Sequence, residues 1–295
     1  MAISFLALDL DGTLLDSRGH ISERNRLAID KAREHGVHVA LVTGRRFRDS
    51  RPLALELGLD IPLISHNGAL TKHAATLQTV SVLPLPLDAA REALRVGREA
   101  GADALLSDDH EGLGVLVYDH LRGENTAAHK YVSWARRIHG EEEESANAVQ
   151  QVVSLEDYLD HEPIHLAFSG TCNEMDQLEE ILKTELGSTV KILGTKYLEQ
   201  DFTLLDILNP AASKGAGVAA AAAELGVARE EIMAIGDNFN DLEMLLFAGV
   251  GVVMANAPLA LREIGGLHPT ASNREDGVAL AIEQFILNRP ELINQ

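Results

Sequence analysis

The chain has 295 residues, 46% of them hydrophobic, so it is long enough to form two domains that each bury a core. Its 25 basic and 45 acidic residues give a formal net charge of −20, which argues against nucleic acid or an anionic membrane as a partner. The single cysteine, Cys172, excludes an internal disulfide and metal sites built from several cysteines, and it fits a reducing compartment. Without a secretion signal pattern or a run of ~18 apolar residues, we expect a cytoplasmic protein with no membrane helix.

An acidic motif follows the first predicted strand. Residues 3–8 are apolar and predict a buried strand, which ends in Asp9-Leu10-Asp11-Gly12-Thr13. In an extended chain residues i and i+2 point to the same side, so the side chains of Asp9 and Asp11 can share one pocket. Two carboxylates so close together are costly unless a positive group lies beside them. The motif therefore indicates a bound cation and a reaction on phosphate.

The next segments alternate between helix and strand patterns. We expect strands at 37–42 and 61–65. A helix is expected at 23–35, with Ser22 as its N-cap, and a second helix is expected after the 37–42 strand, ending near residue 57. This order implies parallel strands joined by right-handed crossovers, which present their carboxyl ends at one edge of a sheet, where ligands bind. Asp9, Thr43 and Asn67 are all expected at that edge.

The pattern changes after residue 70. Residues 71–82 predict a hairpin, and the Leu-Pro-Leu-Pro-Leu run at 83–87 predicts a stiff connector at a domain boundary. Helices and strands then alternate up to residue 200, interrupted by the acidic run at 141–144, which we interpret as a solvated loop. A buried-strand pattern at 203–208 indicates that the first domain resumes there. We therefore predict a discontinuous core of residues 1–83 and 201–295, with an α/β domain of residues 84–200 inserted into it.

Two further polar motifs follow in the resumed domain. Gly236-Asp237-Asn238-Phe239-Asn240-Asp241 comes after an apolar strand at 232–235, and Asp237 and Asp241 are four apart at a helix start, hence on one face. Lys214 follows Ser213 at the start of an alanine-rich helix, where a cation opposes the helix dipole. A lysine that points at a bound phosphate would explain this choice.

These motifs resemble those of haloacid dehalogenase-like phosphatases of the Cof type, which carry a large cap between the second and third motifs. The four matching loops are Asp9-Leu10-Asp11-Gly12-Thr13, Thr43-Gly44-Arg45, Ser213-Lys214-Gly215 and the loop from Gly236 to Asp241. Subfamily features match at Asn67-Gly68-Ala69, at Met254-Ala255-Asn256-Ala257 and at the run from Ser272 to Ala279. The resemblance implies an α/β fold, with a Rossmann-like parallel-sheet core and an inserted α/β cap that selects the substrate.

The resemblance also implies a role for each motif residue. Asp9 would be the nucleophile that forms an aspartyl-phosphate, and Asp11 the general acid and base. Mg²⁺ would bind Asp9, the Asp11 carbonyl and Asp237, with Asp241 in support. The groups that would hold the phosphoryl oxygens or orient the substrate are Thr43, Gly44, Lys214, Asn240 and Asn67.

Three functions are compatible with this resemblance. The favoured one is hydrolysis of small phosphorylated metabolites, such as sugar phosphates, because Asp11 is typical of the phosphatases and phosphomutases of the family. A phosphomutase and a non-catalytic protein that binds a phosphorylated metabolite remain as alternatives. The sequence does not identify the substrate or the oligomeric state.

Overall fold

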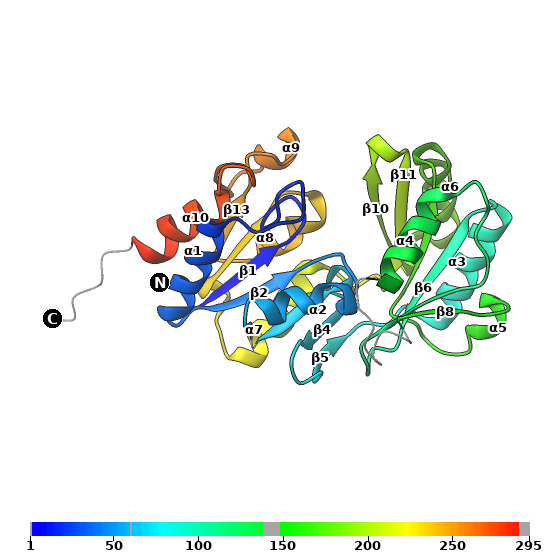
Figure 1. The fold of residues 1–295 in the computed structure, drawn as a ribbon, viewed down its shortest axis with the longest axis horizontal. Helices are drawn as coiled ribbons and strands as arrows, with labels where there is room; N and C mark the ends of the chain where they lie inside the picture. Colours follow the sequence, from blue (N-terminus) through cyan, green and yellow to red (C-terminus); the bar gives the residue numbers. More distant parts are fainter. Residues whose placement is uncertain (1, 60, 138–147, 289–295) are drawn as a thin grey trace. The chain divides into compact units, whose positions relative to one another are not determined.

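The computed structural model describes residues 2–59, 61–137 and 148–288, and the predicted acidic loop at 141–144 lies outside them. The chain forms two compact units (Figure 1). The first contains residues 1–44, 51–76 and 213–295, and the second contains residues 45–50 and 77–212. Among the described residues, no helix is long and apolar enough to cross a membrane.

An eight-stranded sheet has the order β14-β13-β12-β1-β2-β3-β4-β5; its first seven strands in this order belong to the first unit, whereas the edge strand β5 falls within residues 77–212. Neighbouring strands from β14 to β3 are parallel, and β4 is antiparallel to β3. The strands are β1 (Phe5–Asp9), β2 (His38–Val42), β3 (Pro62–Ser65), β4 (Leu70–His73), β5 (Thr79–Val82), β12 (Ile232–Gly236), β13 (Val250–Val253) and β14 (His268–Pro269). This sheet confirms the predicted α/β fold with a parallel-sheet core.

Helices cover this sheet on both faces. The main ones are α1 (Glu23–Glu34), α2 (Phe47–Glu56), α7 (Lys214–Leu225), α8 (Leu242–Phe247), α9 (Leu259–Arg262) and α10 (Gly277–Ile282). Side chains of β1, β2 and β12 pack with α7 and α8 in one apolar cluster, which includes Phe5, Val218 and Leu245. In the sheet, β2 and β3 follow β1 on one side, whereas β13 follows β12 in the other direction. Right-handed crossovers therefore place α1 and α2 on the face opposite to the one that α7 and α8 cover. As predicted, Ser22 caps α1: its hydroxyl accepts a hydrogen bond from the Asn25 amide.

The second unit contains a six-stranded sheet in the order β10-β11-β9-β6-β7-β8. Its strands are β6 (Asp103–Asp108), β7 (Val115–Tyr118), β8 (Val149–Gln151), β9 (His165–Gly170), β10 (Lys191–Tyr197) and β11 (Phe202–Leu208), and its helices are α3 (Leu87–Glu99), α4 (Thr126–Arg137), α5 (Leu155–Tyr158) and α6 (Cys172–Leu186). Phe168 and Leu205 pack with α3 and α6, whereas Ala167, the neighbour of Phe168, packs with α4. Because successive strand residues point to opposite faces, α4 lies on the other face from α3 and α6.

The predicted carboxyl-terminal boundary of the insert is wrong. Strand β11 pairs with β9 and β10 in the second sheet, so the first unit resumes at Ser213 and not at residue 201. The apolar pattern of residues 203–208 was sufficient to predict a buried strand. It carries no information about which of two sheets the strand joins, since that depends on pairing partners distant in sequence.

A second difference concerns residues 45–50, which belong to the second unit although they directly follow Thr43-Gly44. The buried Arg46 guanidinium binds both carboxylate oxygens of Asp49, at 2.7 and 2.8 Å, and its Cζ lies 5.9 Å from the ring centroid of Tyr131 on α4. Arg48 Nε donates to the Gly114 carbonyl at 2.6 Å. The second unit is therefore built from two separate segments of the chain.

Candidate active site

The end of β1 places Asp9 at the carboxyl edge of the first sheet. Leu8 is in register with Ile235 of β12, and Asp9 is in register with Val42 of β2. The loops that follow these strands therefore begin beside Asp9, which is 4% exposed. Parallel register alone brings together motifs that are more than 200 residues apart in sequence.

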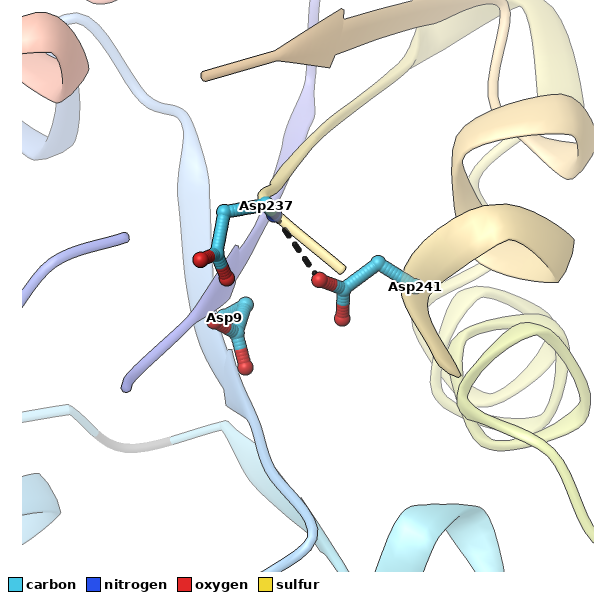
Figure 2. Close-up of side chains that lie close together, drawn as sticks. All are labelled: Asp9, Asp237 and Asp241. Atoms are coloured by element: carbon cyan, nitrogen blue, oxygen red, sulfur yellow. Dashed lines mark hydrogen bonds between the residues drawn. The ribbon is translucent and has the colours of Figure 1, made fainter. Parts of the chain in front are cut away.

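Three carboxylates gather at this edge (Figure 2). One ligand atom from each of Asp9, Asp237 and Asp241 lies within 4.8 Å of those of the other two. The ammonium of Lys214, which is 2% exposed, donates to Asp9 Oδ1 at 2.7 Å and to Asp241 Oδ1 at 2.5 Å. Three carboxylates and one ammonium carry a net formal charge of −2 in a largely buried cluster.

The pKa values in the cluster reflect this excess of negative charge. Burial, with the nearby Asp241 carboxylate, raises the pKa of Asp9 well above its usual range despite the opposing effect of Lys214. Burial and Asp241 likewise raise the pKa of Asp237 to about 6. Burial alone would lower the pKa of Lys214, but Asp241 and Asp9 outweigh it and raise this pKa above its ordinary value. The cluster would be stabilised by additional positive charge.

Asp241 has a structural role in this loop. Its Oδ2 accepts hydrogen bonds from the backbone amides of Asp237 and Asn238, both at 2.9 Å, while its Oδ1 receives the Lys214 ammonium. Figure 2 shows the first of these bonds drawn between Asp241 and Asp237. Asp241 therefore fixes the loop that carries Asp237 and at the same time orients Lys214.

A second group of polar residues surrounds the end of β2. The Thr43 amide donates to the Ile64 carbonyl, and the Asn67 amide donates to the Thr43 carbonyl, at 2.9 and 3.0 Å. A Cβ atom on Gly44 would lie 3.0 Å from Asn67 Oδ1, so the amide of Asn67 packs directly on Gly44. Asn240 Nδ2 donates to Asn67 Oδ1 at 3.0 Å. The structure thus brings together the four residues that the sequence assigned to phosphate or substrate binding beside Lys214.

The loop after β3 has an unusual backbone. His66, Asn67 and Gly68 have φ values of 50°, 52° and 88°, which is the left-handed region. A Cβ on Gly68 would lie 1.8 Å from the carbonyl oxygen of Ser213, so only glycine fits here. Ser213 caps α7, its hydroxyl accepting from the Ala216 amide at 3.0 Å. This close approach brings the start of α7, and with it Lys214, against the Asn67 loop.

Three further residues, Asp11, Thr13 and Asn256, lie in the loops around the cluster. Asp11 is exposed in the loop after β1 and lies outside the carboxylate cluster. Asp237 contacts the buried Thr13, whose hydroxyl donates to Oδ1 at 3.3 Å, and Asn256, whose Nδ2 donates to Oδ2 at 3.2 Å. Both residues lie within motifs that match the family, but a motif match does not show which carboxylate a side chain contacts.

Comparison with known proteins identifies the family of this fold and site. The family model for haloacid dehalogenase-like hydrolases matches residues 6–282. A 5-amino-6-(5-phospho-D-ribitylamino)uracil phosphatase of Bacillus subtilis, YwtE, is 31% identical, with 95% of this chain and 97% of the relative covered. The pyridoxal phosphate phosphatase YbhA of Escherichia coli is 28% identical, with 97% and 100% covered. The crystal structure of a haloacid dehalogenase-like hydrolase from Bacteroides thetaiotaomicron superimposes with a TM-score of 0.77 at 25% identity, covering 96% of this chain and 99% of that one.

The chain belongs to the haloacid dehalogenase-like hydrolase family. The resemblance drawn from the sequence motifs is confirmed, as is the fold with an inserted cap. The named phosphatases among its relatives support the predicted enzyme class, a phosphoric monoester hydrolase of this family.

Proposed function

We propose that the protein is a Mg²⁺-dependent phosphatase that hydrolyses small organic phosphate monoesters through an aspartyl-phosphate intermediate on Asp9. The observation that carries this proposal is the buried carboxylate cluster at the sheet edge, with its single lysine and its net charge of −2. A divalent cation would balance this charge, and the cluster lies beside polar groups suited to hold a phosphoryl group.

The donor set fits magnesium. Mg²⁺ is a hard cation that prefers oxygen ligands, and the cluster offers carboxylate oxygens only. Asp9 and Asp237 would hold the ion together with the Asp11 carbonyl, and Asp241 would support them from the loop that it fixes. When bound, the ion would neutralise negative charge on the phosphoryl group.

The protein's own residues supply the remaining steps. An Asp9 oxygen would attack phosphorus while the bond to the ester oxygen breaks, and Asp11 would donate a proton to that leaving oxygen. Asp11 would then take a proton from the water that attacks the aspartyl-phosphate, which releases inorganic phosphate and regenerates Asp9. Lys214, Thr43 and the Gly44 amide would hold the phosphoryl oxygens, whose charge must be stabilised in the transition state.

Asn67 and Asn240 are the groups proposed to orient the substrate. Asn67 packs on Gly44, and Asn240 donates a hydrogen bond to Asn67, so the two amides are held next to the proposed phosphate-binding group. The second unit would act as the cap that excludes water and selects the leaving group.

The proposed substrate is a small phosphorylated metabolite in the cytoplasm. Phosphatases named for pyridoxal phosphate and for a phosphoribitylamino-uracil cover almost the whole chain at 28% and 31% identity. At this level of identity the relatives support the size and class of the substrate, a metabolite with one phosphate ester, more than its particular structure.

The test measures phosphate release from a panel of sugar phosphates, pyridoxal phosphate and an aryl phosphate, with Mg²⁺ or with a chelator. We expect Mg²⁺-dependent release that is lost in Asp9→Asn and retained in Asp30→Asn, an exposed carboxylate on α1 that serves as the control. Release that persists in Asp9→Asn would contradict the assignment of the nucleophile. Transfer of phosphate to a second sugar without net release would identify a phosphomutase instead.

A further inference from the structure

Two asparagines from loops beyond the sheet edge connect to Asp237. Asn256 lies in the loop after β13, and its Nδ2 donates to the Gly12 carbonyl at 2.8 Å and to Asp237 Oδ2 at 3.2 Å. Asn273 lies in the loop after β14: its backbone amide donates to Asn256 Oδ1 at 3.0 Å, and its Nδ2 donates to the Leu15 carbonyl at 2.9 Å. Together they join the loop that follows Asp9 to the loop that carries Asp237.

The partners determine the orientation of the Asn256 amide. A carbonyl and a carboxylate can only accept hydrogen bonds, so the group that faces them must be the NH₂, which has two hydrogens to donate. The backbone amide of Asn273 can only donate, so it must meet Asn256 Oδ1. All three contacts are satisfied in one orientation, and the opposite orientation would lose each of them.

The carboxylate of Asp237 is consequently held from three sides. Thr13 donates to Oδ1 and Asn256 donates to Oδ2. Gly12 packs so closely that a Cβ atom there would lie 2.3 Å from Oδ2. Each of these contacts restricts rotation of the Asp237 carboxylate. Asn256 also holds the backbone of Gly12, against which this carboxylate packs.

We propose that Asn256 is a positioning residue that orients Asp237 for divalent-cation binding, and that Asn273 acts behind it by holding the Asn256 amide. This inference rests on the proposed function, since it takes Asp237 as a metal ligand. It assigns a role to two motifs, around Asn256 and Asn273, that the proposed chemistry leaves unexplained.

The expected effect is on cation affinity. Loss of a group that orients a ligating carboxylate typically weakens metal binding about 10- to 100-fold. We expect a loss in this range for Asn256→Ala and a smaller loss in the same direction for Asn273→Ala. Because Asn256 is exposed, its truncation should change the thermal stability of the metal-free protein little.

The experiment titrates Mg²⁺ into the substrate-free protein by calorimetry for the wild type, Asn256→Ala, Asn273→Ala and the control Asn288→Ala. Asn288 is an exposed asparagine of the same unit, after α10. Phosphate release at saturating Mg²⁺ is measured in parallel, where the Asn256→Ala enzyme should recover most of its kcat.

A dissociation constant that rises at least about tenfold in Asn256→Ala and stays unchanged in Asn288→Ala supports the inference. An unchanged dissociation constant in Asn256→Ala overturns it, even if the melting temperature falls, because that result is the signature of a merely structural role. The proposed function fails separately, when the wild type releases no phosphate from any compound. A wild type that binds no divalent cation overturns the inference and the metal assignment together.

Discussion

Replacement of Lys214 by methionine tests the charge balance of the site most directly. The ammonium is 2% exposed and lies between the carboxylates of Asp9 and Asp241, at 2.7 and 2.5 Å. Removal of one partner of a buried ion pair costs about 3–5 kcal/mol, because the remaining charge is left unpaired. In Lys214→Met the net formal charge of the cluster changes from −2 to −3. We therefore expect the free energy of unfolding of the metal-free protein to fall by about 3–5 kcal/mol at pH 8.

The destabilisation caused by Lys214→Met should become smaller as the pH falls. Burial and neighbouring carboxylates raise the pKa values of Asp9 and Asp237 in the folded protein, so these groups favour folding at low pH, and this contribution is lost as the pH rises through their folded pKa values. Without Lys214 these pKa values rise further, and protons replace the missing cation at pH 5. The destabilisation should thus be smaller at pH 5 than at pH 8 by at least about 1.4 kcal/mol, the equivalent of one pKa unit.

The assay is urea denaturation with EDTA at both pH values, followed by far-UV circular dichroism. The control is Lys31→Met, an exposed lysine on α1, for which a change within about 0.5 kcal/mol is expected at either pH. A destabilisation below about 1 kcal/mol in Lys214→Met, or one that is equal at pH 5 and pH 8, would refute the electrostatic reasoning, since a merely hydrophobic or steric change has no such pH dependence.

Three further predictions concern the same unit. The metal-free wild type should lose stability between pH 5 and pH 8, because the pKa of Asp237 is raised to about 6, and saturating Mg²⁺ should reduce this loss. A free energy of unfolding that stays constant between pH 5 and pH 8 in urea titrations would contradict this prediction. In Gly12→Ala the new Cβ would lie 2.3 Å from Asp237, so we expect at least a tenfold drop in kcat/KM (about 1.4 kcal/mol). Gly19→Ala has a similar positive φ but no atom within 4 Å, and equal losses in both variants would refute a specific clash. Gly68→Ala should destabilise the protein by more than about 3 kcal/mol and Gly266→Ala by about 1 kcal/mol, because only a Cβ on Gly68 would meet a backbone carbonyl, at 1.8 Å. Similar melting temperatures for the two variants would contradict the close packing of Gly68 on Ser213.

The sequence predicted most of the strands of the first unit and the residues at their carboxyl ends. The apolar run before Asp9 and the alternation of strands with helices were sufficient, because buried parallel strands have a strong local pattern. Register then brings Asp9, Thr43 and Asp237 to one edge without further information. The roles of Asp9 and Asp11 in catalysis stay predictions.

The features that the sequence did not predict depend on tertiary contacts. Strand β11 has the pattern of a buried strand, but its place in the second sheet follows from its pairing with β9 and β10. The contact of Asn256 with Asp237 arises where loops after two different strands meet, and no local pattern records it. Residues 45–50 belong to the second unit, in which Arg46 packs beside Tyr131, and no local pattern predicts this contact between distant segments.

This last feature limits how the inserted unit can be exchanged between relatives. A graft that transfers residues 77–212 alone would bring Tyr131 and Gly114 into a foreign host and leave Arg46 and Arg48 behind. The transplanted unit would then lack the cation–π contact of Arg46 with Tyr131 and the hydrogen bond from Arg48 to the Gly114 carbonyl. A functional chimera has to carry residues 45–50 as well, and because Ser50 lies within α2 (Phe47–Glu56), the second junction has to follow the end of that helix. The unit behaves as a module made of two pieces, and substitutions on the short piece are expected to co-vary with those on the long one.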